Sequence, residues 1–257
     1  MERNRPLILI SNDDGLDYNG IQSLIKVASR LGDVLVAAPA EHQSGKSSAI
    51  SLDSVVRAIP VANEEGFTAY KVTGTPADCV KLGISQLAPR RPDLVVAGIN
   101  HGYNMGVSTI YSGTMACVFE AVMHRVPGVA FSLGDYSRDA DTRPCEPIVE
   151  HILRRVLASG LPTDVCLNVN IPVEINGGLE GIKVTTSDMG QWINEWLPVT
   201  DEEGKPCYRM GGDYEMADED DDRTDMYWLK RGHVTVTPCH VDQTDFAAMT
   251  LVERMLD

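Results

Sequence analysis

The chain has 257 residues, of which 43% are hydrophobic and 23% charged, and its formal net charge is −15. This length is sufficient for a folded domain without disulfides, and the composition is typical of a soluble globular protein rather than a disordered or membrane protein. The negative charge argues against binding to nucleic-acid polymers, although a small phosphorylated substrate stays compatible because a cation and backbone amides can reverse the potential locally.

The N-terminal residues and the cysteines indicate a cytoplasmic protein. The segment MERNRPLILISNDDG contains only Leu7–Ile10 as an apolar run, which is too short for a signal peptide, and no later segment has the length of a membrane span. The six cysteines are scattered, without a C-x-x-C pair or zinc-ligand spacing, so we expect reduced and mostly buried thiols.

Short apolar runs and amphipathic segments alternate along the N-terminal half. The expected strands are rich in β-branched residues and lie at Leu7–Ile10, Val34–Ala38, Leu94–Ala97 and Val129–Phe131. The expected helices cover about 20–31, a segment opening with Thr75-Pro76-Ala77-Asp78, the stretch from Ser112 to about Arg125, and about 146–158. This alternation predicts an α/β fold with a mostly parallel sheet and helices on both faces.

Two segments depart from this alternation. Residues 53–72 show period-two alternation and are interpreted as a β-hairpin insertion. After strands near 165–170 and 182–185, residues 187–233 contain all three tryptophans among Gly, Asp and Glu, with little helical periodicity. We interpret 187–233 as an extended oligomerisation arm on a single domain spanning 1–257, followed by a strand at 234–237 and a closing helix near 246–255.

Polar loops follow three of the predicted strands, where ligands of a doubly wound sheet collect. Asp13 and Asp14 are adjacent carboxylates, and their repulsion at about 4 Å would be roughly 4 kcal/mol at an effective dielectric near 20. A divalent cation removes this penalty, and oxygen atoms from Ser44 and Asn100 would complete a site suited to Mg²⁺ or Mn²⁺. The alternative is that Asn12-Asp13-Asp14-Gly15 only forms a tight turn capping the next helix.

Other motifs of phosphate chemistry are absent or incomplete. The segment Gly45-Lys46-Ser47-Ser48 lacks the first glycine of a P-loop because Ala40 stands there, and no G-x-G-x-x-G follows the first strand. Ser112-Gly113-Thr114 precedes a predicted helix whose N-terminal amides could face an anion, although Ser112 or Thr114 could equally serve as a simple N-cap. The acidic run 218–222 lacks the spacing of a calcium loop, so we expect a solvated loop.

Four sequence blocks, LILISNDDG, APAEHQSGKSSAIS, VVAGINHGYNMG and IYSGTMA, resemble in order and spacing the signature blocks of the SurE family of 5′(3′)-nucleotidases, and GHVTVTP near residue 232 resembles the late strand of that family. The resemblance spans nearly the whole chain. It implies a Rossmann-like core, a C-terminal region that exchanges between subunits of a homodimer or homotetramer, and hydrolysis of nucleoside monophosphates with one divalent cation, Mg or Mn, per subunit.

The resemblance also assigns roles to individual positions. The implied metal ligands are Asp13, Asp14, Ser44 and Asn100. The implied phosphate-binding residues are Asn12, Gly45, Asn104, Ser112, Gly113 and Thr114. The chain departs from the family pattern at 107–109, where acidic residues are frequent, and at 117–119, where small residues are frequent; these departures bear on the shape of the pocket and on base preference.

In the implied reaction Asp13 orients or deprotonates the attacking water, and Asn100 and Asn104 stabilise charge as the leaving alkoxide forms. His101 is either the general acid or a brace for its loop. Two alternatives stay open: a phosphatase acting on short polyphosphates or other phosphomonoesters, and a non-catalytic nucleotide-binding regulator.

Overall fold

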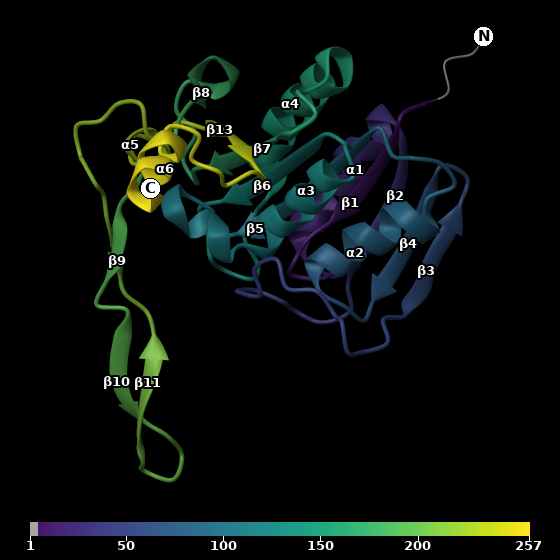
Figure 1. Cartoon of the computed structure of the whole chain (residues 1–257). Helices are drawn as coiled ribbons and strands as arrows, with labels where there is room; N and C mark the ends of the chain where they lie inside the picture. The colour runs from purple at the N-terminus through teal and green to yellow at the C-terminus, as the bar shows by residue number, and fades with distance from the viewer. Residues whose placement is uncertain (1–4) are drawn as a thin grey trace.

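The computed structural model describes residues 5–257 and contains a central sheet of nine strands with helices on both faces (Figure 1). The predicted α/β class is therefore confirmed, as are the four strands and four helices expected in the N-terminal half. A narrow ribbon of antiparallel strands projects from one end of this body (Figure 1). In the described part of the chain, no helix is both long and apolar enough to cross a membrane.

The strands of the central sheet are parallel except for two antiparallel pairs, β3 with β4 and β7 with β13. In spatial order they are β3 (Ala58–Glu64), β4 (Phe67–Val72), β2 (Asp33–Pro39), β1 (Leu7–Ser11), β5 (Leu94–His101), β6 (Gly128–Leu133), β7 (Val165–Ile171), β13 (Thr235–His240) and β8 (Lys183–Val184). The projecting ribbon consists of β9 (Gln191–Ile193), β10 (Trp196–Thr200), β11 (Pro206–Met210) and β12 (Asp213–Glu215).

The helices connect these strands across both faces of the sheet. The α-helices are α1 (Asn19–Leu31), α2 (Pro76–Leu82), α3 (Gly113–Met123), α4 (Glu146–Ser159), α5 (Asp225–Leu229) and α6 (Met249–Leu256). Helix α2 continues into the π-helical turn η1 (Gly83–Leu87), and three 3₁₀ turns are η2 (Gly106–Tyr111), η3 (Arg143–Cys145) and η4 (Gly178–Gly181).

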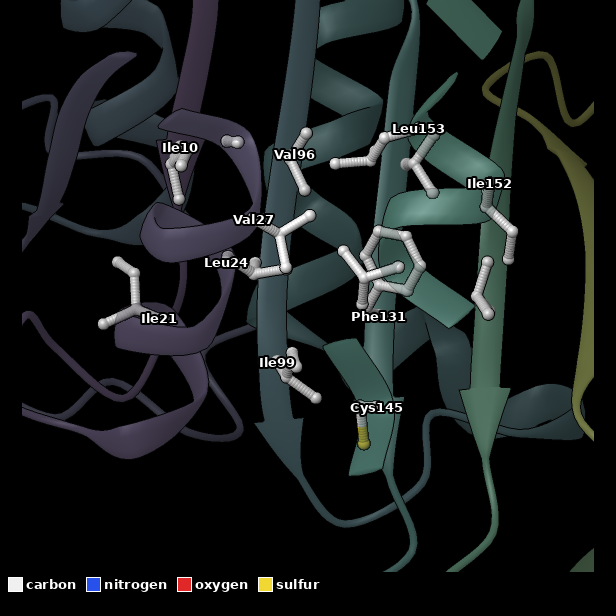
Figure 2. Packing of buried hydrophobic residues seen from close by; sticks show 14 of the residues in the cluster. Ile10, Ile21, Leu24, Val27, Val96, Ile99, Phe131, Cys145, Ile152 and Leu153 are labelled. Carbon is white, nitrogen blue, oxygen red and sulfur yellow. The ribbon is translucent and has the colours of Figure 1, made fainter. Parts of the chain in front are cut away.

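One face of the sheet is covered by α1 and α4 (Figure 2). Ile21, Leu24, Val27 and Ala28 recur at steps of three or four residues along α1, so they form one apolar stripe that packs against the strands. Each such side chain contributes about 1.5–3 kcal/mol when it is fully buried. At the start of this helix a Cβ on Gly20 would lie 2.0 Å from the carbonyl oxygen of Ile99, so only glycine lets α1 begin directly against the end of β5.

The opposite face is covered by α2 and α3, whose first residues are fixed by local caps. The Thr75 hydroxyl accepts a hydrogen bond from the Asp78 amide while the Asp78 carboxylate accepts one from the Thr75 amide, so these two residues form a capping box. The Ser112 hydroxyl caps α3 by accepting from the Met115 amide. These caps bring the N-termini of both helices to the carboxyl edge of the parallel strands.

The interpretation of residues 53–72 as an insertion is wrong in one respect. A hairpin does form there, but β4 pairs in parallel with β2 along its whole length and so extends the central sheet. Ala69 and Val72, which point to opposite faces of β4, are both buried, so this strand is covered on both sides. The alternation in the sequence predicts the two strands, but it does not indicate that β4 pairs with β2 across the loop 40–57.

The range 187–233 is more diverse than its sequence suggests. Strands β9 to β12 form two successive antiparallel pairs, whereas helix α5 packs its Met226 and Leu229 into a small cluster against the body. The helix is only five residues long, which explains why no helical periodicity is visible in the sequence. The acidic run 218–222 lies in a largely exposed loop, and all six cysteines are free thiols, as expected.

Candidate active site

The first site loop leaves β1 in a turn built by Asn12. Its side-chain amide donates to the Gly15 carbonyl and its side-chain oxygen accepts from the Gly15 amide, both at 3.0 Å. Gly15 adopts a φ of +108°, which favours glycine. Both polar atoms of the Asn12 side chain thus serve the turn, which holds Asp13 and Asp14 at the carboxyl end of the strand.

Asp13 faces the N-terminus of α3. The Thr114 hydroxyl donates to Asp13 Oδ1 at 2.5 Å and lies 3.5 Å from Asn100 Oδ1, so oxygens from three segments converge. The Asn100 side-chain amide donates to the Gly102 carbonyl, which leaves Oδ1 directed toward this point. A Cβ on Gly113 would lie 2.8 Å from Asp13 Cβ, so the helix terminus approaches the carboxylate as closely as a backbone can.

The electrostatic state of Asp13 reflects this enclosure, since only 3% of the residue is exposed. Burial raises the pKa of Asp13 from 3.8 to about 6; the hydrogen bond from Thr114 opposes the shift, and repulsion from Asp14 adds to it. Burial disfavours the ionised form because it removes solvation, and the weak attraction from His42 does not compensate for this loss. Asp13 is therefore a buried carboxyl group at the position where we expect a cation to bind.

Asp14, 4% exposed, is engaged by two histidines. His101 Nδ1 lies 2.9 Å from Asp14 Oδ2, and His42 Nδ1 lies 3.4 Å from Asp14 Oδ1. The sequence left open whether His101 is a general acid or braces its loop, and the structure directs it to Asp14. His42 was not singled out in the sequence, although it stands within the polar loop that follows β2.

The loop after β2 is more exposed than the first. Ser44 and Gly45 are both exposed, and Gly45 has a φ of +73° with open space where a side chain would project. Within residues 5–257 the Ser44 hydroxyl makes no hydrogen bond, so its predicted role as a metal ligand stays a prediction. The loop is nevertheless tied to the site, because the Gln43 amide donates to the Asp13 carbonyl at 2.7 Å and the Ser47 hydroxyl donates to the Ile110 carbonyl.

Asn104 lies in a buried network that the sequence analysis missed. The backbone amide of Asn104 donates to Asn170 Oδ1, and its side-chain NH₂ donates to Ser132 Oγ at 2.9 Å. Its backbone carbonyl accepts from the side chains of Asn168 and Asn170. Two asparagines, Asn168 and Asn170, at alternate positions of the strand expected near 165–170 were the available signal, because polar side chains that become buried require partners. The network fixes the position of Asn104, whose side-chain NH₂ donates one of its two hydrogens to Ser132.

Comparisons with known proteins agree with this arrangement. Residues 8–194 match the model of the family described as Survival protein SurE. The chain belongs to the SurE family. It is 39% identical to a protein of Phocaeicola vulgatus named 5′-nucleotidase SurE, over 97% of this chain and 96% of the relative, and 42% identical to one of the same name from Cytophaga hutchinsonii, over 94% and 93%.

A solved structure supports the fold over its whole length. The crystal structure of the SurE protein from Aquifex aeolicus has a TM-score of 0.82 to this chain at 32% sequence identity, covering 98% of this chain and 100% of that one. The Rossmann-like core expected from the family resemblance is therefore confirmed, and the extended C-terminal arm is built of antiparallel strands.

The two departures from the SurE pattern acquire structural explanations. Ser108, which stands where acidic residues are frequent, accepts a hydrogen bond from Trp192 Nε1 at 2.8 Å. Cys117 and Val118, which replace smaller residues in α3, are fully buried in the cluster beneath that helix. Ser108 thus joins the active-site loop to the arm, and Cys117 and Val118 fill the core.

The base of the arm holds the loop that carries Asn104. The Gly106 amide donates to Asp225 Oδ2 at 2.7 Å, and a Cβ on Gly106 would lie 2.4 Å from the Tyr214 hydroxyl. Tyr214 donates to Asp188 and contacts Trp192 edge to face. This group of four residues (Asp188, Trp192, Tyr214 and Asp225), which we name the arm base, therefore fixes the backbone between Asn104 and the start of α3.

The donor set fits a hard divalent cation. In residues 5–257 no three His, Cys, Asp or Glu side chains come together as a metal site, so a cation at Asp13 and Asp14 requires neutral oxygens to complete its shell. Asn100 Oδ1 lies beside Thr114 and Asp13 as one such neutral oxygen, and the tethered loop carries a second on Ser44. Carboxylate, amide and hydroxyl oxygens suit Mg²⁺ or Mn²⁺ rather than zinc.

Proposed function

We propose that this chain is a divalent-metal-dependent 5′(3′)-nucleotidase that hydrolyses nucleoside monophosphates to nucleoside and phosphate. The observation that carries the proposal is the convergence of Asp13 and Asn100 with Thr114 at the N-terminus of α3, beside Asp14. The names of its relatives, 5′-nucleotidase SurE, agree with this chemistry. We further propose one cation per subunit, either Mg²⁺ or Mn²⁺, a cytoplasmic location and a homodimeric or homotetrameric assembly.

The phosphate would lie next to the carboxylates, in front of the N-terminus of α3. The amides of Gly113 and Thr114 belong to the first turn of that helix, whose N–H groups have no intrahelical acceptor and favour an anion. A divalent cation, when bound, stabilises negative charge on the phosphoryl group and makes water easier to deprotonate. Ser112 contributes mainly by holding the helix start, since its hydroxyl is used as the cap.

The protein's own groups then handle the proton and the leaving group. Asp13 has a pKa of about 6, so it is mostly ionised at neutral pH and can accept a proton from the attacking water. Asn100 directs Oδ1 toward the site, so it would stabilise developing charge through the cation that it helps to hold. Asn104 uses one side-chain N–H on Ser132, and its second N–H can donate to the substrate.

Phosphate release from a panel of phosphoesters tests the proposal. The panel contains nucleoside monophosphates, short polyphosphates and sugar phosphates, each assayed after exhaustive chelation and after addition of Mn²⁺ or Mg²⁺. We expect activity on nucleoside monophosphates that chelation abolishes and the metals restore. Full activity in chelator would refute the metal site, preferential release from polyphosphate would favour the broader phosphatase, and nucleotide binding without release would indicate a regulator.

A further inference from the structure

Aromatic rings cluster on the Asp14 side of the site. The Tyr18 ring stacks on the His42 imidazole with centroids 5.9 Å apart and an interplanar angle of 19°. It also contacts His101 at 5.7 Å in a tilted arrangement, and the Arg138 guanidinium lies 5.0 Å from its centroid. Both histidines of this cluster touch Asp14, so the rings begin at the carboxylate itself.

This cluster is not part of a packed core. None of its rings belongs to the described apolar clusters, and 51% of the His42 side chain is exposed although one face lies against Tyr18. A nearly parallel ring pair with one member half in solvent presents a flat apolar surface beside a polar site. Folding gains little from such an arrangement, whereas a planar ligand could extend the stack.

The Asp13 side of the site is closed. Gly113 approaches Asp13 so closely that a single Cβ would clash with it, and the loop containing Ser47 is bonded to Ile110 beside α3. A phosphate bound next to the carboxylates, in front of the N-terminus of α3, would then have room for its ester group on the Asp14 and His42 side, where the rings lie.

We propose that the stacked pair of His42 and Tyr18 is the platform for the nucleobase of the substrate. The inference rests on the proposed nucleotidase function and deepens it. Stacking of a base on an aromatic side chain contributes about 1–3 kcal/mol and tolerates any base, because every base has a π-face. The platform thus selects for substrates that carry a base, without ranking the bases, and disfavours simple sugar phosphates.

Paired substrates test the platform. The value of kcat/KM is measured for adenosine 5′-monophosphate and for ribose 5-phosphate, which is the same ester without its base. In the unaltered enzyme the ratio of these values exceeds one. We expect His42→Ala and Tyr18→Ala each to lower the ratio by about tenfold, through KM rather than kcat, whereas His42→Phe and Tyr18→Phe, which keep the rings, retain it.

The design separates stacking from the contact between His42 and Asp14. If His42 acts only through Asp14, His42→Ala and His42→Phe lose activity on both substrates equally, the ratio stays constant, and the platform is refuted. An unaltered ratio in Tyr18→Ala, or a ratio near one in the unaltered enzyme, refutes it as well.

The failure of the proposed function gives a different result. If neither ester is hydrolysed, the nucleotidase proposal fails, and calorimetric titration of the same two compounds in the presence of Mn²⁺ still decides the platform. Tighter binding of the nucleotide that is lost in the alanine variants and kept in the phenylalanine variants supports the platform. Equal affinities for the two compounds overturn it.

Discussion

The buried carboxylate of Asp13 destabilises the metal-free protein at neutral pH. The pKa of the Asp13 carboxyl is 3.8 when it is exposed and about 6 in the fold. Between pH 3.8 and about pH 6 the folded chain therefore keeps a proton that the unfolded chain has released. Stability from this group is therefore greatest below about pH 4 and is lost as the pH rises to about 6. Raising the pKa of Asp13 from 3.8 to about 6 lowers the free energy of unfolding at neutral pH by about 3 kcal/mol.

Asp13→Asn, which keeps an oxygen for the Thr114 hydroxyl, is accordingly expected to raise the free energy of unfolding of the chelated protein at pH 7 by up to about 3 kcal/mol. Urea unfolding at pH 7 and near pH 4 measures this. The gain should vanish near pH 4, where Asp13 is protonated in the fold. Asp139→Asn on an exposed loop controls for the loss of one charge, and an equal gain for Asp13→Asn at both pH values would contradict the prediction.

The proposed ligands should differ in their effects on activity. Asp14→Asn removes a buried charged oxygen and is expected to reduce kcat by about two orders of magnitude or more. Ser44→Ala removes a neutral hydroxyl from an exposed loop, so a higher metal concentration for half-maximal activity is expected, with a smaller loss of kcat. Metal titration of activity compares the two variants. Complete inactivation by Ser44→Ala, with trapping of a phosphoserine, would instead make Ser44 a nucleophile.

At the scale of elements, the sequence predicts what local signals encode. The strands were visible as apolar runs, and α2 was visible because Thr75 and Asp78 cap it within three residues. The contact of Asp14 with His101 joins residues 87 positions apart, so no local sequence pattern near either residue predicts it. The same holds for the pairing of β4 with β2 and for the arm base, where a catalytic loop meets side chains more than eighty positions away.

The arm base should control the active-site loop through Gly106. A Cβ there would lie 2.4 Å from the Tyr214 hydroxyl and 2.7 Å from the Asp188 carbonyl, in addition to the strain of its φ of +51°. Gly106→Ala is therefore expected to destabilise the fold by about 2–4 kcal/mol and to lower kcat by displacing the loop. Thermal unfolding and steady-state kinetics measure both effects.

Gly178→Ala is the matched control for this variant. Gly178 has the same φ of +51°, but no atom lies within 4 Å of the added Cβ. It should cost only the backbone strain, about 1 kcal/mol, and leave kcat unchanged. Equal kinetic behaviour of the two variants would show that the arm base does not position the loop.

At the scale of the whole molecule, two surfaces suggest assembly. The β10–β11 ribbon stands away from the body (Figure 1) and exposes Trp196, Leu197, Tyr208 and Met210. Helix α6 has no buried residue although five of its eight residues are large and apolar. Apolar side chains exposed at this density mark an interface. We therefore expect the ribbon to contact another subunit, which is the role predicted for the range 187–233.

Deletion of residues 195–211 tests this role without disturbing the active site. Replacing the whole range 189–231 would also remove Trp192, Tyr214 and Asp225, whereas the shorter deletion keeps the arm base intact. It joins Asn194 to Gly212 between the paired residues Ile193 and Asp213, and both joined residues already have positive φ, so an Asn-Gly hairpin turn can form. Light scattering should give a smaller assembly while metal-dependent turnover is retained. If the deletion leaves the mass of the assembly unchanged, and only a chain that ends before Met249 dissociates, the interface belongs to α6. A parent protein that is monomeric at micromolar concentration would refute an interface at either surface.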